Sequence, residues 1–426
     1  MTCLRPLLLT ASPPGGHGVG QIYMDSLCRH MSPRAGLVAA LLAQGDRWNL
    51  PADLEPRETV RLNRRYESVY RPLRGPLGEA AARAGVRFRL QPHVRRLTVQ
   101  ATNAGRNAGV DAVIAVLESP AVMLMAARLA DELSVPLFSL VWDVPEHVLP
   151  LLGHTGGSSQ PLKRGFDDAL RRSARVAVMS DAMQRRFVND YGSRCVILRQ
   201  PIADAWPRDR PAADRSPDKD FLIGFAGSVT ARDEMELLCR ALDSVNWTLA
   251  GRRVRLRVFG LRYVCQAQTA RWIEYRGYVP DTADVVAGLS DCDVLFLPQP
   301  FGPQGRPFAE FSFPTKFTTY LAAQRPLLIL APPHSALADF CRQHELPVVC
   351  DQLREATVLD QLQRLASDPD LVAEIEQRLQ AVADSEFRPP LFRDRIREWL
   401  STDPAATAPV RDTSRICVTS EAAASR

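Results

Sequence analysis

A lysine at the start of an apolar helical segment is the strongest chemical signal in this 426-residue sequence. It lies in EFSFPTKF, residues 310–317. There Pro314 restricts the turn, Thr315 is placed to cap the next helix, and Lys316 falls in that helix's first turn. A cation is unfavourable there because the N-terminus of a helix is itself positive. A bound anion would remove the conflict, so we expect Lys316 to contact an anionic ligand.

A glycine-rich loop, SPPGGHGVG (12–20), joins an apolar run to a helical pattern. Its Gly16 and Gly18 let a ligand approach the backbone beside a helix N-terminus. The loop lacks the third glycine and the following acidic residue of a dinucleotide fingerprint. It therefore predicts another phosphate or a sugar as ligand, with a merely flexible loop as the alternative.

A second loop of small residues, FAGSVTARD (225–233), has the same setting. Gly227 and Ser228 admit a phosphate to the helix N-terminus, and Arg232 could hold it through two hydrogen bonds. The alternative is a surface arginine beside a helix start.

A carboxylate, Asp143, follows a third apolar run in VWDVPEH (141–147). At the carboxyl end of a strand it can orient or deprotonate a sugar hydroxyl, and His147 titrates near neutrality. The alternative for Asp143, a cap of the next turn, is equally weighted. For His147 the alternative, a histidine on the surface without a role in the site, is favoured.

Short apolar runs separated by helical patterns must position these loops. Strands apolar on both faces indicate parallel sheets covered by helices. The pattern predicts an α/β protein with two Rossmann-like, doubly wound domains facing each other across a cleft. Expected strands are 7–10, 111–117, 135–141, 175–179, 221–225, 254–259, 273–279, 293–298, 326–330 and 347–350. Expected helices are 21–30, 120–133, 182–191, 233–245, 282–289, 316–323, 335–344 and 391–400.

A segment rich in proline and aspartate, 201–220, predicts a linker between an N-terminal domain at 1–200 and a C-terminal domain at 221–385. Residues 386–402 hold a last helix. The composition of 403–426 turns to Ala, Thr and Ser, which predicts a disordered tail.

Composition excludes several classes of protein. Hydrophobic residues make up 46% and charged residues 24%, and the net charge of +5 is too small for a dedicated nucleic-acid binder. Nine scattered cysteines without a CxxC pair imply neither a zinc site nor a disulfide framework. The apolar stretch Leu4–Thr10 is too short for a signal or membrane segment, so we expect a cytoplasmic protein.

The basic charge is concentrated in Arg57–Arg106, where 12 arginines face only three acidic residues. Such a region could bind an anionic membrane surface or a lipid diphosphate acceptor. A solvated, arginine-rich helical face is an equally weighted alternative.

Seven segments, in order along the chain, resemble GT-B glycosyltransferases of the family 4 (group 1) type: GGHGVG, VWDVPEH, VAVMSDAM, FAGSV, IEYRGYVP, CDVLFLPQ and SFPTKFTTYLAAQRPLLIL. Together they extend over most of the chain. The resemblance implies that the N-terminal domain binds the acceptor and the C-terminal domain a nucleoside diphosphate sugar. It also implies that the last helix returns toward the N-terminal domain.

The resemblance further assigns roles. Ser228, Arg232 and Lys316 would face the diphosphate, backbone near Tyr278 and Val279 would meet the nucleobase, and Glu310 would lie near sugar or ribose hydroxyls. The chain departs from the family in having Thr319 in place of the second of two paired glutamates, and Glu310 stands one position from the first. The predicted donor-binding set is Gly16, Gly18, Gly227, Ser228, Tyr278, Val279, Glu310, Ser312, Pro314, Thr315 and Thr319, and the predicted catalytic set is Asp143, Lys316 and Arg232.

The implied activity is a retaining, hexosyltransferase-type transfer to a glycan or lipid-linked acceptor in cell-envelope or exopolysaccharide synthesis, without a cofactor. Asp291-Cys292-Asp293 matches the metal-binding Asp-x-Asp of the other main glycosyltransferase fold. Here Asp293 would begin a strand, at the end away from the ligand, so we predict no required metal. The alternatives are a catalytically inactive glycosyltransferase-like binding subunit and a nucleotide-sugar epimerase.

Overall fold

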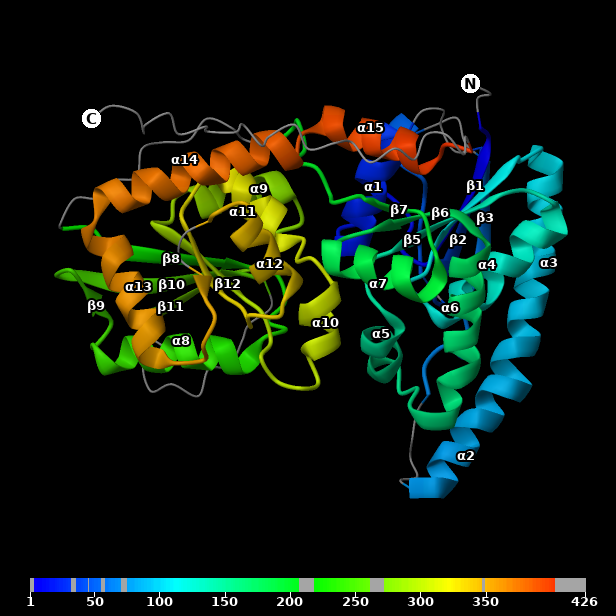
Figure 1. Cartoon of the computed structure of the whole chain (residues 1–426), viewed down its shortest axis with the longest axis horizontal. Coiled ribbons are helices and arrows are strands. Elements are labelled where there is room, and N and C mark those ends of the chain that lie inside the picture. Colours follow the sequence, from blue (N-terminus) through cyan, green and yellow to red (C-terminus); the bar gives the residue numbers. More distant parts are fainter. Residues whose placement is uncertain are drawn as a thin grey trace, which may run out of the picture.

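A computed structural model describes residues 4–31, 36–44, 46–54, 58–69, 75–206, 218–260, 272–346 and 349–402. Most of the expected linker (207–217), the expected tail (403–426) and three arginines of the basic region (Arg57, Arg71 and Arg74) lie outside these residues. Figure 1 shows two α/β halves side by side, with α14 and α15 running along one edge of the pair.

The first half is built on a parallel sheet with strand order β3-β2-β1-β4-β5-β6-β7. Strands β1, β4 and β5 are buried along their whole length, because helices cover both faces of the sheet. Its strands are β1 Pro6–Thr10, β2 Leu37–Leu42, β3 Glu58–Asn63, β4 Ala112–Val116, β5 Leu137–Val141, β6 Ser173–Val178 and β7 Cys195–Ile197. Its helices are α1 Val19–His30, α2 Gly75–Gly85, α3 Gln91–Ala108, α4 Pro120–Leu133, α5 Pro145–Leu151, α6 Gln160–Arg172 and α7 Asp181–Tyr191, with short turns η1 Ala52–Leu54, η2 Val86–Leu90 and η3 Gly156–Ser158.

The second half repeats this plan with strand order β11-β10-β8-β12-β13-β14, and only β9 runs antiparallel, against β10, among the described strands. Its strands are β8 Phe221–Ala226, β9 Thr248–Leu249, β10 Arg252–Phe259, β11 Ile273–Gly277, β12 Val294–Pro298, β13 Leu327–Leu330 and β14 Val349–Cys350. Its helices are α8 Arg232–Ser244, α9 Thr282–Ser290, α10 Arg306–Phe311, α11 Lys316–Ala323, α12 Ala336–Gln343, α13 Glu355–Ser367 and α14 Pro369–Glu386, followed by α15 Pro389–Trp399.

The predicted fold class is confirmed, since two parallel sheets lie between helices. Helices α4 and α11 match their predicted bounds at both ends. Among the described strands, the prediction missed the buried β2 and the short β7 and β9. It also missed β3, because this edge strand is exposed at most positions and lacks a continuous apolar run. It also extended β11 too far, since the strand ends at Gly277, where a positive φ of 74° turns the chain.

Helices α2 and α3 join through the π-helical turn η2 into one continuous rod. Gly85 and Gln91, on either side of the turn, keep right-handed helical backbone angles. Buried positions recur every four residues through the turn, at Ala82, Val86 and Leu90, because the wider turn keeps one face toward the sheet. Figure 1 shows α2 at the far end of this rod, beyond the edge of the sheet.

The chain crosses back between the halves near its C-terminus. Helix α15 contacts α1, β6 and β7 of the first half, and the ring of its Phe392 lies 6.1 Å from that of Tyr23. At the crossing, the guanidinium of Arg199 is buried and forms ion pairs with Asp181 (2.8 Å) and Glu386 (3.5 Å). These contacts tie the two halves to each other.

Candidate functional site

Lys316 lies where β8 ends and α11 begins, on the carboxyl edge of the second sheet. Its ammonium donates a hydrogen bond to the backbone oxygen of Ser228 (2.6 Å) and lies 4.2 Å from the centre of the Phe225 ring. No carboxylate of the described residues pairs with it. Burial alone lowers the pKa of Lys316 to about 7, so a bound anion would restore its charge.

Glycine is required beside this lysine. Gly227 has a φ of +88°, and a Cβ at that position would lie 3.1 Å from Cε of Lys316. The neighbouring Gly260 packs as closely, since a Cβ there would lie 2.6 Å from the backbone oxygen of Gly227. The two glycines therefore let this backbone pack closely against Lys316.

The loop that precedes Lys316 reaches across to the first half. The buried Ser312 hydroxyl donates a hydrogen bond to the carboxylate of Asp143, which follows β5. The neighbouring backbone oxygen of Phe311 accepts a hydrogen bond from Ser180 (2.6 Å). Figure 1 shows α10 between the two halves, next to α5 and α7. Only three residues separate Ser312 from Lys316, so the carboxylate and the lysine predicted for catalysis are joined through one short segment.

A pocket of about 450 Å³ lies beside Asp143, along the carboxyl edge of the first sheet. Its volume is within the range of small-molecule sites, about 300–1,000 Å³. The described lining residues come from the loops after β2, β3, β4 and β5 and from α5: Ala43, Arg64, Tyr66, Glu67, Ser68, Glu118, Ser119, Asp143, His147, Val148, Leu151 and Leu152.

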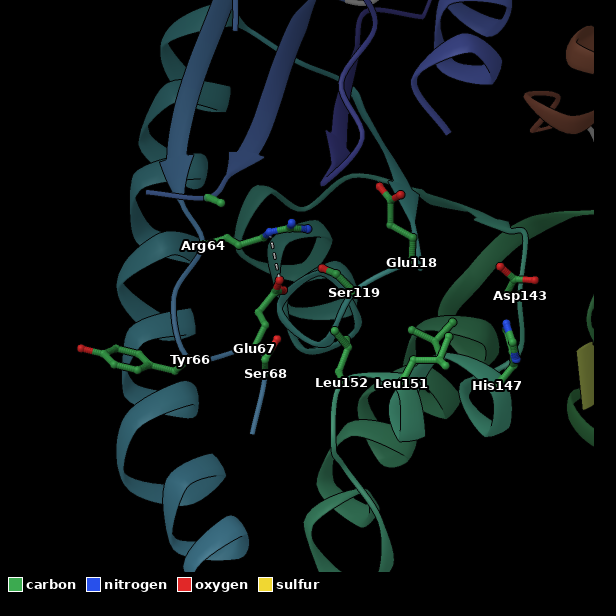
Figure 2. Close-up of a pocket in the computed structure, with 12 residues that line it drawn as sticks. Arg64, Tyr66, Glu67, Ser68, Glu118, Ser119, Asp143, His147, Leu151 and Leu152 are labelled. Atoms are coloured by element: carbon green, nitrogen blue, oxygen red, sulfur yellow. Dashed lines mark ion pairs between the residues drawn. The ribbon is translucent and has the colours of Figure 1, made fainter. Parts of the chain in front are cut away.

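Figure 2 shows how these side chains are arranged around the pocket. Asp143 and His147 lie at one end and the Arg64–Glu67 ion pair (3.3 Å) at the other. Leu151 and Leu152 lie between them on one side, and the Glu118 carboxylate lies opposite the leucines. The surface position favoured for His147 is wrong, because its ring lines the pocket and packs 4.8 Å from the ring of Phe308. Burial lowers the pKa of His147 against the opposing effect of Asp143.

Glu118, which sequence reasoning missed, fixes the loop after β1. Its carboxylate accepts hydrogen bonds from the Thr10 hydroxyl (2.7 Å), the backbone N–H groups of Ala11 (2.7 Å) and Ser12 (2.9 Å), and the Ser12 hydroxyl (2.6 Å). Burial raises the pKa of Glu118, and these four bonds oppose that rise. The sequence did contain a signal for this residue, because Glu118 is a carboxylate directly after the predicted apolar strand 111–117.

Gln299, the first residue after β12, is a second missed residue. It is only 1% exposed, and neither polar atom of its side chain has a hydrogen-bond partner among the described residues. Burying an unpaired amide is costly, so its position at the carboxyl edge of the second sheet favours a ligand as its partner.

The other predicted residues are spread along the same edges. Thr315 occupies the N-cap position of α11 but makes no side-chain cap, since its backbone is already helical. Arg232 begins α8 on the surface, Tyr278 and Val279 follow β11, and Glu310 pairs with Arg306 (3.3 Å) on α10. Among the described residues, no hydrogen bond or ion pair joins any of these side chains to Lys316. Gly16 and Gly18 lie in the loop before α1, Pro314 lies just before Thr315, and Thr319 is a half-buried residue of α11.

Asp293 lies at the opposite edge of the second sheet. It accepts a hydrogen bond from the backbone N–H of Leu222 (2.7 Å) and pairs with Arg252 (3.1 Å), at the start of β8 and β10. Its place away from the ligand edge agrees with the expectation for the Asp-x-Asp sequence.

No protein-family model and no curated protein matches this chain in sequence. Solved structures match it over nearly its whole length. HepE of Anabaena, in complex with UDP and glucose, has 15% identity and a TM-score of 0.62 over 93% of this chain and 98% of its own. The lipopolysaccharide outer core galactosyltransferase WaaB has 11% identity and a TM-score of 0.58 over 92% and 98%. Sucrose-phosphate synthase from Thermosynechococcus elongatus has 13% identity and a TM-score of 0.58 over 92% and 97%.

Likeness at such low identity establishes the fold. This likeness agrees with the two parallel sheets of the chain. The carboxyl edge of the second sheet carries Lys316, and that of the first sheet carries the pocket. The chain has the fold of GT-B glycosyltransferases.

Proposed function

We propose that the protein transfers a glycosyl group from a nucleoside diphosphate sugar, bound at Lys316, to an acceptor bound in the pocket beside Asp143. The observation that carries this proposal is the Asp143–Ser312 hydrogen bond. It joins the pocket to the segment that ends in a desolvated lysine without a carboxylate partner among the described residues. We also propose that the N-terminal domain spans residues 1–200 and the C-terminal domain residues 221–385. The segment with the last helix then spans residues 386–402.

The chemistry follows from the charges. As the bond to the sugar breaks, negative charge develops on the diphosphate, and Lys316, assisted by Arg232 and the helix N-termini, stabilises it. Because these groups can take the place of a metal, we propose metal-independent transfer. Retention at the anomeric carbon rests on the family resemblance.

Donor turnover tests the proposal. HepE was solved with UDP and glucose, so UDP-glucose is the first donor to assay. We expect Lys316→Met to lower the rate at which nucleoside diphosphate is formed by about 100-fold or more. A metal chelator should leave the wild-type rate unchanged. Nucleotide binding without turnover would favour the inactive subunit, and conversion of the donor without acceptor would favour the epimerase.

The arginine-rich rod supports a second proposal, that this protein binds an anionic membrane surface at its cytoplasmic face and acts in envelope or exopolysaccharide synthesis. The apolar side chains of Phe88 and Val99 are 68% and 50% exposed on the rod. Around them are arginines that form no ion pair with any described residue: Arg83, Arg87, Arg89, Arg95 and Arg96. Unpaired cations interleaved with apolar groups suit an anionic bilayer. Within the described ranges, no helix has the length and apolarity needed to cross a membrane.

Vesicle flotation tests the membrane proposal. We expect binding to anionic but not neutral vesicles at low salt, and release at high salt. Arg89→Glu should weaken binding, whereas Arg164→Glu, an exposed arginine of α6, is the matched control. Equal loss in both variants, or no binding at low salt, would argue for a solvated helical face.

A further inference from the structure

The charge of the pocket restricts what it can bind. Three carboxylates line it, those of Glu67, Glu118 and Asp143, against the single guanidinium of Arg64. That guanidinium is already engaged by Glu67, whose other oxygen accepts a hydrogen bond from the backbone N–H of Ala121 (2.9 Å). The described carboxylates and guanidinium of the lining therefore leave a net negative charge, which disfavours a phosphate or a carboxylate on a ligand.

Asp143 is the carboxylate best placed to meet an uncharged ligand. Glu118 already accepts four hydrogen bonds from the loop after β1. In Asp143, Oδ1 accepts the bond from Ser312, and no described residue bonds to Oδ2. A carboxylate oxygen with free capacity accepts a hydroxyl hydrogen well and repels an anion.

The wall that faces Glu118, between the two ends of the pocket, is apolar. Val148, Leu151 and Leu152 line it, and the side chain of Leu151 is 73% exposed. Sugars present C–H groups on the faces of their rings and hydroxyls around their rims. A wall of leucines beside a carboxylate is complementary to both features.

We infer that the pocket binds an uncharged saccharide, with its hydroxyls toward Asp143 and a ring face against Leu151 and Leu152. This inference rests on the proposed function and names its acceptor class. Phosphorylated sugars are poor ligands, and the phosphate groups of a lipid-linked acceptor lie outside this pocket.

Ligand-observed NMR on the full chain tests the inference without a donor. The probes are maltose and cellobiose, and the pair glucose and glucose 6-phosphate. We expect the uncharged sugars to bind and glucose 6-phosphate to bind at least about tenfold more weakly than glucose. Equal or tighter binding of the phosphorylated sugar, or binding of no uncharged saccharide, would overturn the inference.

Two pairs of variants connect the result to this pocket. Asp143→Asn keeps an oxygen for Ser312 but removes the charge. It should weaken saccharide binding and reduce the tenfold preference for glucose over glucose 6-phosphate. Asp168→Asn, exposed on α6, should change neither. Leu151→Arg should shift the preference toward glucose 6-phosphate, whereas Leu77→Arg, at an equally exposed leucine of α2, should not. Unchanged preferences in Asp143→Asn and Leu151→Arg would refute the assignment.

A donor assay separates the two ideas. If UDP-glucose binds and is slowly hydrolysed but no uncharged saccharide binds, the proposed function stands and the acceptor inference fails. If uncharged saccharides bind with the stated preference and no nucleotide sugar binds, the pocket assignment stands and glycosyl transfer fails.

Discussion

Nucleotide binding should draw a proton onto Lys316. The pKa of Lys316 is lowered to about 7 by burial, so at about pH 8 only about a tenth of the free protein carries that charge. A diphosphate beside the ammonium would raise the pKa again. Binding at this pH should then take up about 0.9 proton per nucleotide, and affinity should fall about tenfold per pH unit above 7.

Calorimetry of UDP binding in two buffers with different enthalpies of ionisation measures this uptake. At about pH 8 the terminal phosphate, with a pKa of about 6, is already ionised and contributes little. Lys316→Arg stays charged and should bind without uptake, while Lys316→Met should bind weakly and without uptake. A wild-type uptake near zero, or one unchanged in Lys316→Met, would show that the lysine does not meet the diphosphate.

The same pKa affects stability in the absence of ligand. The unfolded chain keeps the ordinary lysine value of 10.5, so between about pH 7 and 10.5 it binds more protons than the folded chain. Stability should therefore rise with pH through this window, and Lys316→Met should remove that rise in urea unfolding. A rise that persists in the variant would have another origin.

Three further substitutions test other contacts. Gly227→Ala forces a side chain at a φ of +88° and against Lys316, so UDP affinity should fall with a loss of about 1 kcal/mol in unfolding free energy; unchanged affinity by calorimetry would place the ligand elsewhere. Arg199→Met removes the buried partner of Asp181 and Glu386, two partly exposed carboxylates of which Glu386 keeps Arg395, and should cost about 1–3 kcal/mol in urea unfolding. A loss under about 0.5 kcal/mol would exclude this role. Gln299→Leu should leave the melting temperature equal or higher, because an unpaired buried amide is removed, while weakening UDP-glucose binding; a large loss of stability would show that the amide is satisfied within the protein.

Local pattern was sufficient for the fold class and for most element positions. Continuous apolar strands such as Asp111–Leu117 and periodic helices such as Pro120–Leu133 report their surroundings directly, since both faces or one face must be buried. The edge strand Glu58–Asn63 was missed because it has water on most of its sides. Loops rich in glycine, or ending in a charged residue, follow the strands at the carboxyl edge of each sheet, as the sequence predicts.

The sequence by itself determined that a lysine begins α11 and that a carboxylate follows β5, because both are local statements about residue order. Only the tertiary structure decided that these two loops meet, through Ser312 and Asp143. It alone decided also that Lys316 has no carboxylate partner among the described residues, and that Glu118, Asp143 and the leucines of α5 surround one pocket. Contacts and desolvation depend on segments far apart in the chain, and no local pattern of residues specifies which of them become neighbours.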